Sequence, residues 1–228
     1  MTKFRAVKML VLVAGLLVVG VSSASAAACS TFVGSAVSTL TTCDINLTYS
    51  GQSFTVTFSN FSDGGASNMV LNAVDSSNLT GQAGLQFVGS PAGTPIGTFT
   101  GFSYTASITS ACNSGFTCYI IGQYQQAAFG ALGNPSGSVT YTTDTCNVPP
   151  VLTPSASTYG PSLCGSYIPA GSNDVVTASY VPGTNTLNNL ETDVYVGSVT
   201  NAPEPTTFVL MGAGLGLIGM LRRKTARR

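Results

Sequence analysis

The sequence contains no histidine and no tryptophan, and its lysines and arginines occur only near the two ends of the chain. The basic residues stop at Lys8 and resume at Arg222, so the long segment between them has no cationic side chain. Nucleic-acid binding needs basic side chains against phosphate, and a Ser-His-Asp or Cys-His catalytic site needs histidine. The composition therefore excludes a nucleic-acid partner and both of these catalytic arrangements.

Charged residues make up only 7% of the chain, against about 25% in ordinary soluble domains. The acidic residues lie in the middle of the sequence, at Asp44, Asp63, Asp75, Asp144, Asp174, Glu191 and Asp193, with Glu204 close to the C-terminus. The net charge of zero thus hides an anionic middle between two basic ends. Such a middle segment is expected to be well hydrated and to offer few charges for tight contacts.

Residues 1–28 have the pattern of a secretory signal peptide. Three basic residues near the start precede an apolar run over 9–21, and a run of small residues over 22–28 follows. Both Ala24-Ser25-Ala26 and Ala26-Ala27-Ala28 fit the cleavage site of a signal peptidase. The sequence therefore predicts export and removal of this segment.

Cys29 follows this segment directly, which makes lipidation of Cys29 an alternative. The residues before it fit a lipoprotein site poorly, because Ala26 stands where leucine is expected. Lipidation would also leave an odd number of cysteines, so we favour ordinary cleavage.

The C-terminus has three parts in a fixed order. Pro203, Glu204 and Pro205 form a rigid tripeptide that does not continue a helix. Residues 206–221 are an apolar helix candidate, about 24 Å long, which crosses a membrane when flanking basic side chains reach the interface. The chain then closes on a basic cluster that begins with Arg222, Arg223 and Lys224 and is expected to stay in the cytoplasm, so the middle lies outside.

This order of proline–glutamate–proline, short apolar segment and basic end resembles the PEP-CTERM sorting domain, over Pro203 to Arg228. The resemblance implies a bacterium with exosortase, a membrane protease-transpeptidase that recognises and cleaves such tails. It also implies an association with exopolysaccharide and biofilm matrix. The expected location is the cell envelope, the cell surface or the extracellular matrix, with a transient anchor in the inner membrane.

The exported middle, residues 29–200, is predicted to be all-β. Apolar and polar residues alternate at Phe54, Val56 and Phe58 and over 69–74, 85–88, 98–108, 118–124, 138–143, 175–181 and 192–199. Turn-forming residues separate these segments, which favours an antiparallel β-sandwich or jelly roll between a signal helix and a short transmembrane helix. Residues 124–132 are a candidate for one helical turn, and 148–169, which are rich in proline, are predicted to be a long loop.

Six cysteines in an exported chain indicate disulfides. Sequential pairing is the arrangement we favour among fifteen possibilities, because it closes three short loops: Cys29–Cys43, Cys112–Cys118 and Cys146–Cys164. Zinc-type cysteine spacing is absent from the sequence. We predict no cofactor and no metal site, since turn chemistry accounts for Asp63-Gly64-Gly65 and for Asn173-Asp174 without calcium.

Glu191 and Asp193 are the candidate catalytic pair, because acids two apart on a strand face the same side. Two such carboxylates occur in glycoside hydrolases, but they are more often a solvated surface. The nine tyrosines could instead stack on sugar rings, as in a carbohydrate-binding module. We therefore predict a non-enzymatic surface or matrix protein; the alternatives are a module that binds exopolysaccharide and, less favoured, a glycoside hydrolase.

Overall fold

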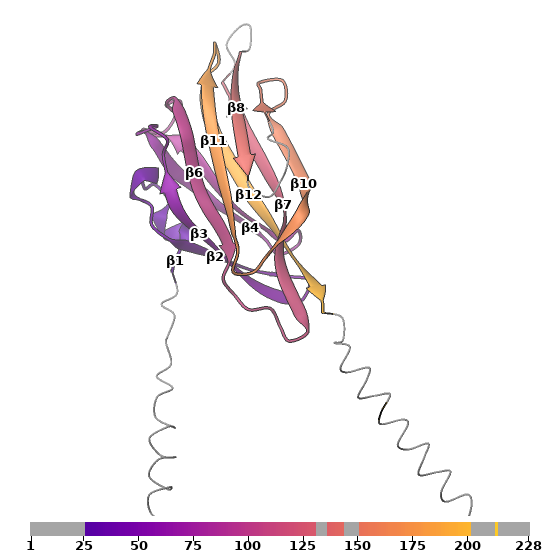
Figure 1. The fold of residues 1–228 in the computed structure, drawn as a ribbon. Coiled ribbons are helices and arrows are strands. Elements are labelled where there is room, and N and C mark those ends of the chain that lie inside the picture. The colour runs from indigo at the N-terminus through magenta and orange to yellow at the C-terminus, as the bar shows by residue number, and fades with distance from the viewer. Residues whose placement is uncertain (1–25, 131–135, 144–150, 202–212, 214–228) are drawn as a thin grey trace, which may run out of the picture.

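The computed structural model describes residues 26–130, 136–143, 151–201 and 213. The strands within 26–201 form two β-sheets that face each other (Figure 1). The sandwich predicted from the sequence is confirmed in this part of the chain. The signal helix and the transmembrane helix fall on residues outside it. Among the described residues, no helix has both the length and the apolar character needed to span a bilayer.

The described elements are twelve strands and two short 3-10 helices. In chain order they are β1 (Ala27–Ala28), η1 (Cys29–Phe32), η2 (Val37–Thr39), β2 (Cys43–Tyr49), β3 (Gln52–Ser62), β4 (Met69–Ser77), β5 (Gln82–Gly89), β6 (Phe99–Ile108), β7 (Phe116–Phe129), β8 (Gly137–Thr143), β9 (Val151–Leu152), β10 (Thr158–Pro169), β11 (Asn173–Pro182) and β12 (Leu187–Thr200).

The strands are shared between a seven-stranded sheet, in the order β1-β2-β3-β6-β11-β8-β9, and a five-stranded sheet, in the order β10-β7-β12-β5-β4. All the pairings are antiparallel except that of β1 with β2. Most connections between consecutive strands lead from one sheet to the other, so strands that are distant in the sequence become neighbours in a sheet. This places β12 at the centre of the five-stranded sheet, between β7 and β5.

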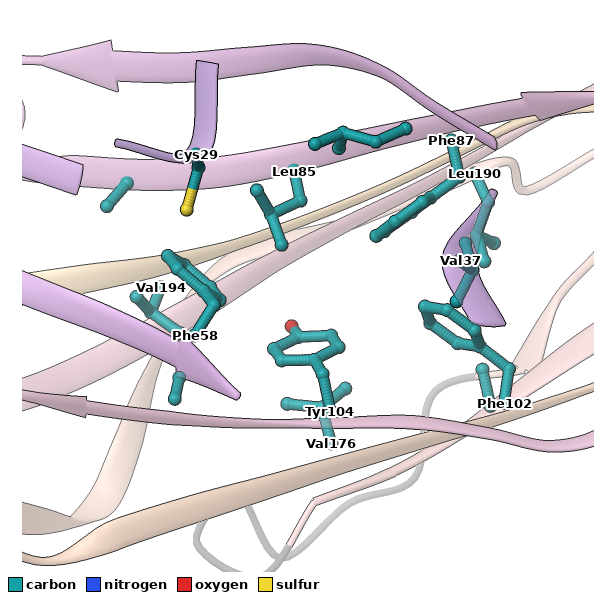
Figure 2. Packing of buried hydrophobic residues seen from close by; sticks show 14 of the residues in the cluster. Cys29, Val37, Phe58, Leu85, Phe87, Phe102, Tyr104, Val176, Leu190 and Val194 are labelled. Atoms are coloured by element: carbon teal, nitrogen blue, oxygen red, sulfur yellow. The ribbon is translucent and has the colours of Figure 1, made fainter. Parts of the chain in front are cut away.

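Period-two alternation explains how the strands bury one face. Phe54, Val56 and Phe58 of β3 are buried, and the threonines between them are half-buried on the opposite face. The core between the sheets also contains Leu85 and Phe87 of β5, as Figure 2 shows. A continuous apolar layer of this kind is the main stabilising contribution expected for a sandwich.

One turn shows why glycine is required between two strands. Gly64 has a φ of +59°, and a Cβ placed on it would lie 2.4 Å from the backbone nitrogen of Phe102. A side chain at residue 64 would therefore collide with β6. Asp63 completes the turn, because its Oδ1 accepts a hydrogen bond from the backbone N–H of Gly65 at 2.9 Å, as turn chemistry predicts.

Two expectations about local structure are wrong. The region 148–169 contains an edge strand, β10, which pairs with β7 through two register shifts. Proline is tolerated in an edge strand and at irregular positions, which is why a proline-rich sequence can still pair here. The described part of 124–132 is not a helical turn either, because β7 continues to Phe129.

The described domain begins before residue 29. Ala27 and Ala28 pair with Cys43 and Asp44, so both alanines are part of the seven-stranded sheet. Of the two cleavage sites that the sequence offers, the one after Ala26 would keep this strand in the mature protein.

Two of the three expected disulfides are present, Cys29–Cys43 and Cys112–Cys118. Cys29 is fully buried, and its sulfur is bonded to Cys43, which leaves no thiol for lipidation. The third expected pair, Cys146 and Cys164, lies outside the residues and side chains that the structure describes.

A polar contact between two hydroxyl groups joins the two sheets within the apolar layer. The hydroxyl of Tyr104 on β6 lies 2.5 Å from the hydroxyl of Thr192 on β12. Figure 2 shows the Tyr104 ring among Phe58, Phe102 and Leu85, and both hydroxyl-bearing residues are buried. Burial raises the pKa of the Tyr104 hydroxyl, so it keeps its proton and the hydrogen bond persists across ordinary pH.

We expect Tyr104→Phe to lower the free energy of unfolding by about 1–3 kcal/mol, because the buried Thr192 hydroxyl loses its partner. Thr192→Val should cost a similar amount. The double variant should lose clearly less than the sum of the two, as equilibrium denaturation in urea would measure. Additive losses would mean that the two hydroxyls do not interact.

Candidate functional site: the outer face of the five-stranded sheet

The outer face of the five-stranded sheet gathers the acids that the sequence singles out. Glu191 and Asp193 both point to this face of β12, as their spacing predicts, while Leu190, Thr192 and Val194 are buried towards the other sheet. Asp75 of β4 lies in the same cross-strand row as Asp193, with Gly84 of β5 between them. Glu191 and Asp193, two residues apart on β12, thus lie beside a third acid, Asp75, that is more than a hundred residues away in the sequence.

One carboxylate oxygen from each of Asp75, Glu191 and Asp193 lies within 4.8 Å of the other two. We call these three residues the acidic cluster. Asp75 is exposed, Glu191 is half-buried and Asp193 is fully buried, so the cluster runs from the solvent to the surface of the sheet. The expectation of a solvated acidic pair is therefore wrong for Asp193.

Gly84 makes room for the buried carboxylate. A Cβ built on Gly84 would lie 1.5 Å from Oδ1 of Asp193, so any other residue would occupy the position of this oxygen. The carboxylate lies against the sheet because the opposite residue on β5 has no side chain. The glycine in this strand thus marks a close approach, as interior strand glycines often do.

Amide side chains on β5 bind the acidic cluster. Nε2 of Gln82 donates to Oδ2 of Asp193 at 2.5 Å and to Oδ2 of Asp75 at 3.3 Å. Nε2 of Gln86 donates to Oε2 of Glu191 at 3.3 Å, and its Oε1 accepts a hydrogen bond from Asn72 at 2.6 Å. The carboxylates therefore contact neutral donors, because no basic residue occurs between Lys8 and Arg222.

Burial of Asp193 next to other acids changes its acidity. Desolvation, and then the negative charge of Glu191, raise the pKa of Asp193 from 3.8 to about 7; Asp75 adds to the rise, and the Gln82 hydrogen bond opposes it. Near neutral pH this carboxyl exchanges between its protonated and ionised forms. Such a shift is common at functional sites and also occurs in structural networks.

Tyrosines extend this face along the sheet. Tyr124 lies in the row of Asp193 on β7, and Tyr195 lies one row further on β12. Tyr119 of β7 follows in the next row, and its ring centroid is 5.8 Å from that of Tyr167 on β10. Tyr167 is exposed and the other three are half-buried. By contrast, Tyr104, Tyr141 and Tyr180 are buried.

Asp174, the second position considered for a calcium turn, is instead a buried residue of β11. It accepts a hydrogen bond from Nε2 of Gln123 on β7, which links the two sheets. Its neighbour Asn173 is exposed at the start of the same strand. Neither residue lies in a loop that could wrap a metal ion.

The C-terminal end of the chain carries a signal for protein sorting. The family model described as the PEP-CTERM protein-sorting motif matches residues 201–228, and the chain is a PEP-CTERM domain-containing protein. This motif is the signal that exosortase processes, and it implies export to the cell envelope or surface. No curated protein and no solved structure shows significant similarity to the chain.

The sorting match and the acidic face are separate features. Pro203, Glu204 and Pro205, and the basic cluster of Arg222, Arg223 and Lys224, lie outside the described residues. The described domain reaches to Asn201, whose backbone N–H donates to Gly115 at 2.8 Å. The sorting signal therefore follows directly after the last strand of the sandwich.

We expect the stability of the protein to fall as the pH rises from about 4 to about 7 in metal-free buffer. The pKa of Asp193 is raised to about 7 on folding, so the folded state holds this proton more tightly than the unfolded state does. This contribution is complete below the unfolded value of 3.8 and is lost above about 7. Asp193→Asn should flatten the profile, as measured by melting temperature against pH.

The titratable neighbours of Asp193 are Asp75 on β4, Glu191 on β12 and the tyrosines at 104, 124, 141 and 195. The tyrosines keep their protons in this range, because burial raises the pKa of each. Asp63→Asn is the matched control, since it removes one charge in an exposed turn. An identical slope in Asp193→Asn and Asp63→Asn would contradict the assignment.

Proposed function

We propose that the protein is a non-enzymatic component of the bacterial cell surface or extracellular matrix that exosortase processes at its C-terminal motif. The match of the sorting motif to residues 201–228 carries this proposal. The described domain supports it, because a disulfide-linked β-sandwich with an anionic, amide-rich surface suits a hydrated environment outside the cell.

The acidic face gives little support for catalysis. A general acid must reach the oxygen of the leaving group, and Asp193, the carboxyl with the raised pKa, is 0% exposed. The chain also has no histidine, and residues 9–221 have no cation to stabilise a developing negative charge. These observations favour a structural role over a glycoside hydrolase.

The test of the sorting proposal is the intact mass of the protein from its native host, with and without exosortase. With the enzyme, we expect a C-terminus near Pro203 to Pro205 and an N-terminus at Ala27. Replacing Pro203, Glu204 and Pro205 with alanine should leave the full C-terminus. A C-terminus at Arg228 whether or not exosortase is present would overturn the proposal.

A second candidate function is binding of exopolysaccharide, which the tyrosines of the outer face favour. Tyr119, Tyr124, Tyr167 and Tyr195 lie on one face of one sheet, next to amide and carboxylate groups that can hydrogen-bond sugar hydroxyls. Aromatic rings provide the stacking surface, and polar neighbours set the orientation of the ligand.

This candidate is tested by titrating the purified protein with exopolysaccharide from the native host. Tyr124→Ala and Tyr195→Ala should each weaken binding about tenfold, as removal of an aromatic contact at the centre of an interface does. Tyr49→Ala is the control, because Tyr49 lies at the end of β2 in the seven-stranded sheet. Equal affinity in all three variants would exclude the tyrosine face as the binding surface.

A further inference from the structure

The acidic cluster places three negative charges close together without a cation in the domain. Its carboxylate oxygens lie within 4.8 Å of one another, and no lysine, arginine or histidine occurs from residue 9 to residue 221. Three ionised carboxylates at this separation repel one another strongly. Protonation or an external cation must therefore reduce this repulsion.

A second observation concerns an oxygen within the cluster. Oδ1 of Asp193 is buried and accepts no hydrogen bond, and the whole residue is 0% exposed. Among the side-chain atoms that the structure describes, only two others are buried without a partner, and both belong to neutral amides. A buried carboxylate oxygen without a donor costs free energy and indicates that a ligand completes the site.

The Gln82 amide marks a position between two of the three carboxylates. Its Nε2 sits between Oδ2 of Asp193 and Oδ2 of Asp75 and donates to both. A cation at this position would replace the two N–H donors. Rotation of the amide would then turn Oε1 of Gln82 towards the ion, so the same side chain could supply a fourth oxygen ligand.

We propose that Asp75, Glu191 and Asp193 form a binding site for one Ca²⁺ ion, with Gln82 as an additional ligand. The site goes beyond the proposed sorting function and does not depend on it. Carboxylate and amide oxygens are the ligands that Ca²⁺ prefers, and waters complete its coordination on the side of the exposed Asp75.

The spacing of the cluster favours Ca²⁺ over Mg²⁺. Oxygens that bind Ca²⁺ at about 2.3–2.6 Å can stand up to roughly 5 Å apart, whereas those on Mg²⁺ at about 2.0–2.1 Å reach only roughly 4 Å. The cluster spans up to 4.8 Å, which fits the larger ion with little movement of the strands. Mg²⁺ would require the three carboxylates to close in from β4 and β12.

The experiment is calorimetric titration of the full chain, exported and purified in detergent, with CaCl₂ and with MgCl₂ at pH 8. We expect one Ca²⁺ per chain with a Kd on the order of 10⁻⁴–10⁻³ M, the range of extracellular sites. Mg²⁺ should bind at least tenfold more weakly. Asp193→Asn and Asp75→Asn should each weaken Ca²⁺ binding at least tenfold.

Two features keep the experiment decisive. Asp75 is exposed, so Asp75→Asn tests the site without disturbing the core, and Asp63→Asn removes the same charge elsewhere as a matched control that should bind normally. The proposal is overturned if no binding is detected at Ca²⁺ concentrations tenfold above the expected Kd, or if Mg²⁺ binds as well as Ca²⁺. It is also overturned if Asp193→Asn and Asp75→Asn bind Ca²⁺ as tightly as the parent and the Asp63→Asn control do. None of these outcomes would affect the sorting proposal, which is measured by the C-terminal mass.

Discussion

The constraint behind most of the polar structure is that the exported domain contains no basic residue. Each acid in the described part of the chain must therefore be stabilised by neutral donors, and each accepts a hydrogen bond from an amide, a hydroxyl or a backbone N–H. Glutamines take the role that arginine and lysine have in other proteins: Gln82 and Gln86 on the outer face, and Gln123 between the sheets. An amide supplies two donors but no charge, so it orients a carboxylate without neutralising it. Desolvation and the charge of Glu191 therefore raise the pKa of Asp193, and the Gln82 hydrogen bond only partly opposes them.

Strand β12 connects the interior of the domain to its surface. Thr192, which meets Tyr104 in the core, lies on β12 between Glu191 and Asp193, which face outward. A central strand whose register is fixed from the inside holds its outward carboxylates in place, since a shift by one residue would exchange the two faces. The buried row of β12, which includes this hydroxyl contact, thus determines the face on which Glu191 and Asp193 lie. In addition, Gly84 fixes how closely Asp193 can approach β5.

The sequence predicts the strands well and the site only in part. Alternation identifies segments such as Phe54, Val56 and Phe58, and it places Glu191 and Asp193 on one face, because both depend on a period of two within a single strand. It cannot bring Asp75 to them, because that requires the strand order β4-β5-β12, which is set by packing between segments far apart in the sequence. The same limit hides the role of Gly84, which is visible only opposite Asp193. Strand β10 escapes detection for another reason: its prolines are compatible with an edge position that the local sequence does not reveal.

The place of β12 has a mechanical consequence. The strand ends at Thr200, and the match to the sorting motif begins at residue 201, so the tail follows the last strand directly in the sequence. A protein held through its C-terminus is therefore pulled along the central strand of the five-stranded sheet. Its hydrogen bonds to β7 and β5 run across the direction of that force. Both ladders must be sheared together, whereas an edge strand such as β4 could be peeled away one bond at a time. A chain pulled through β12 should therefore resist force better than one pulled through an edge strand.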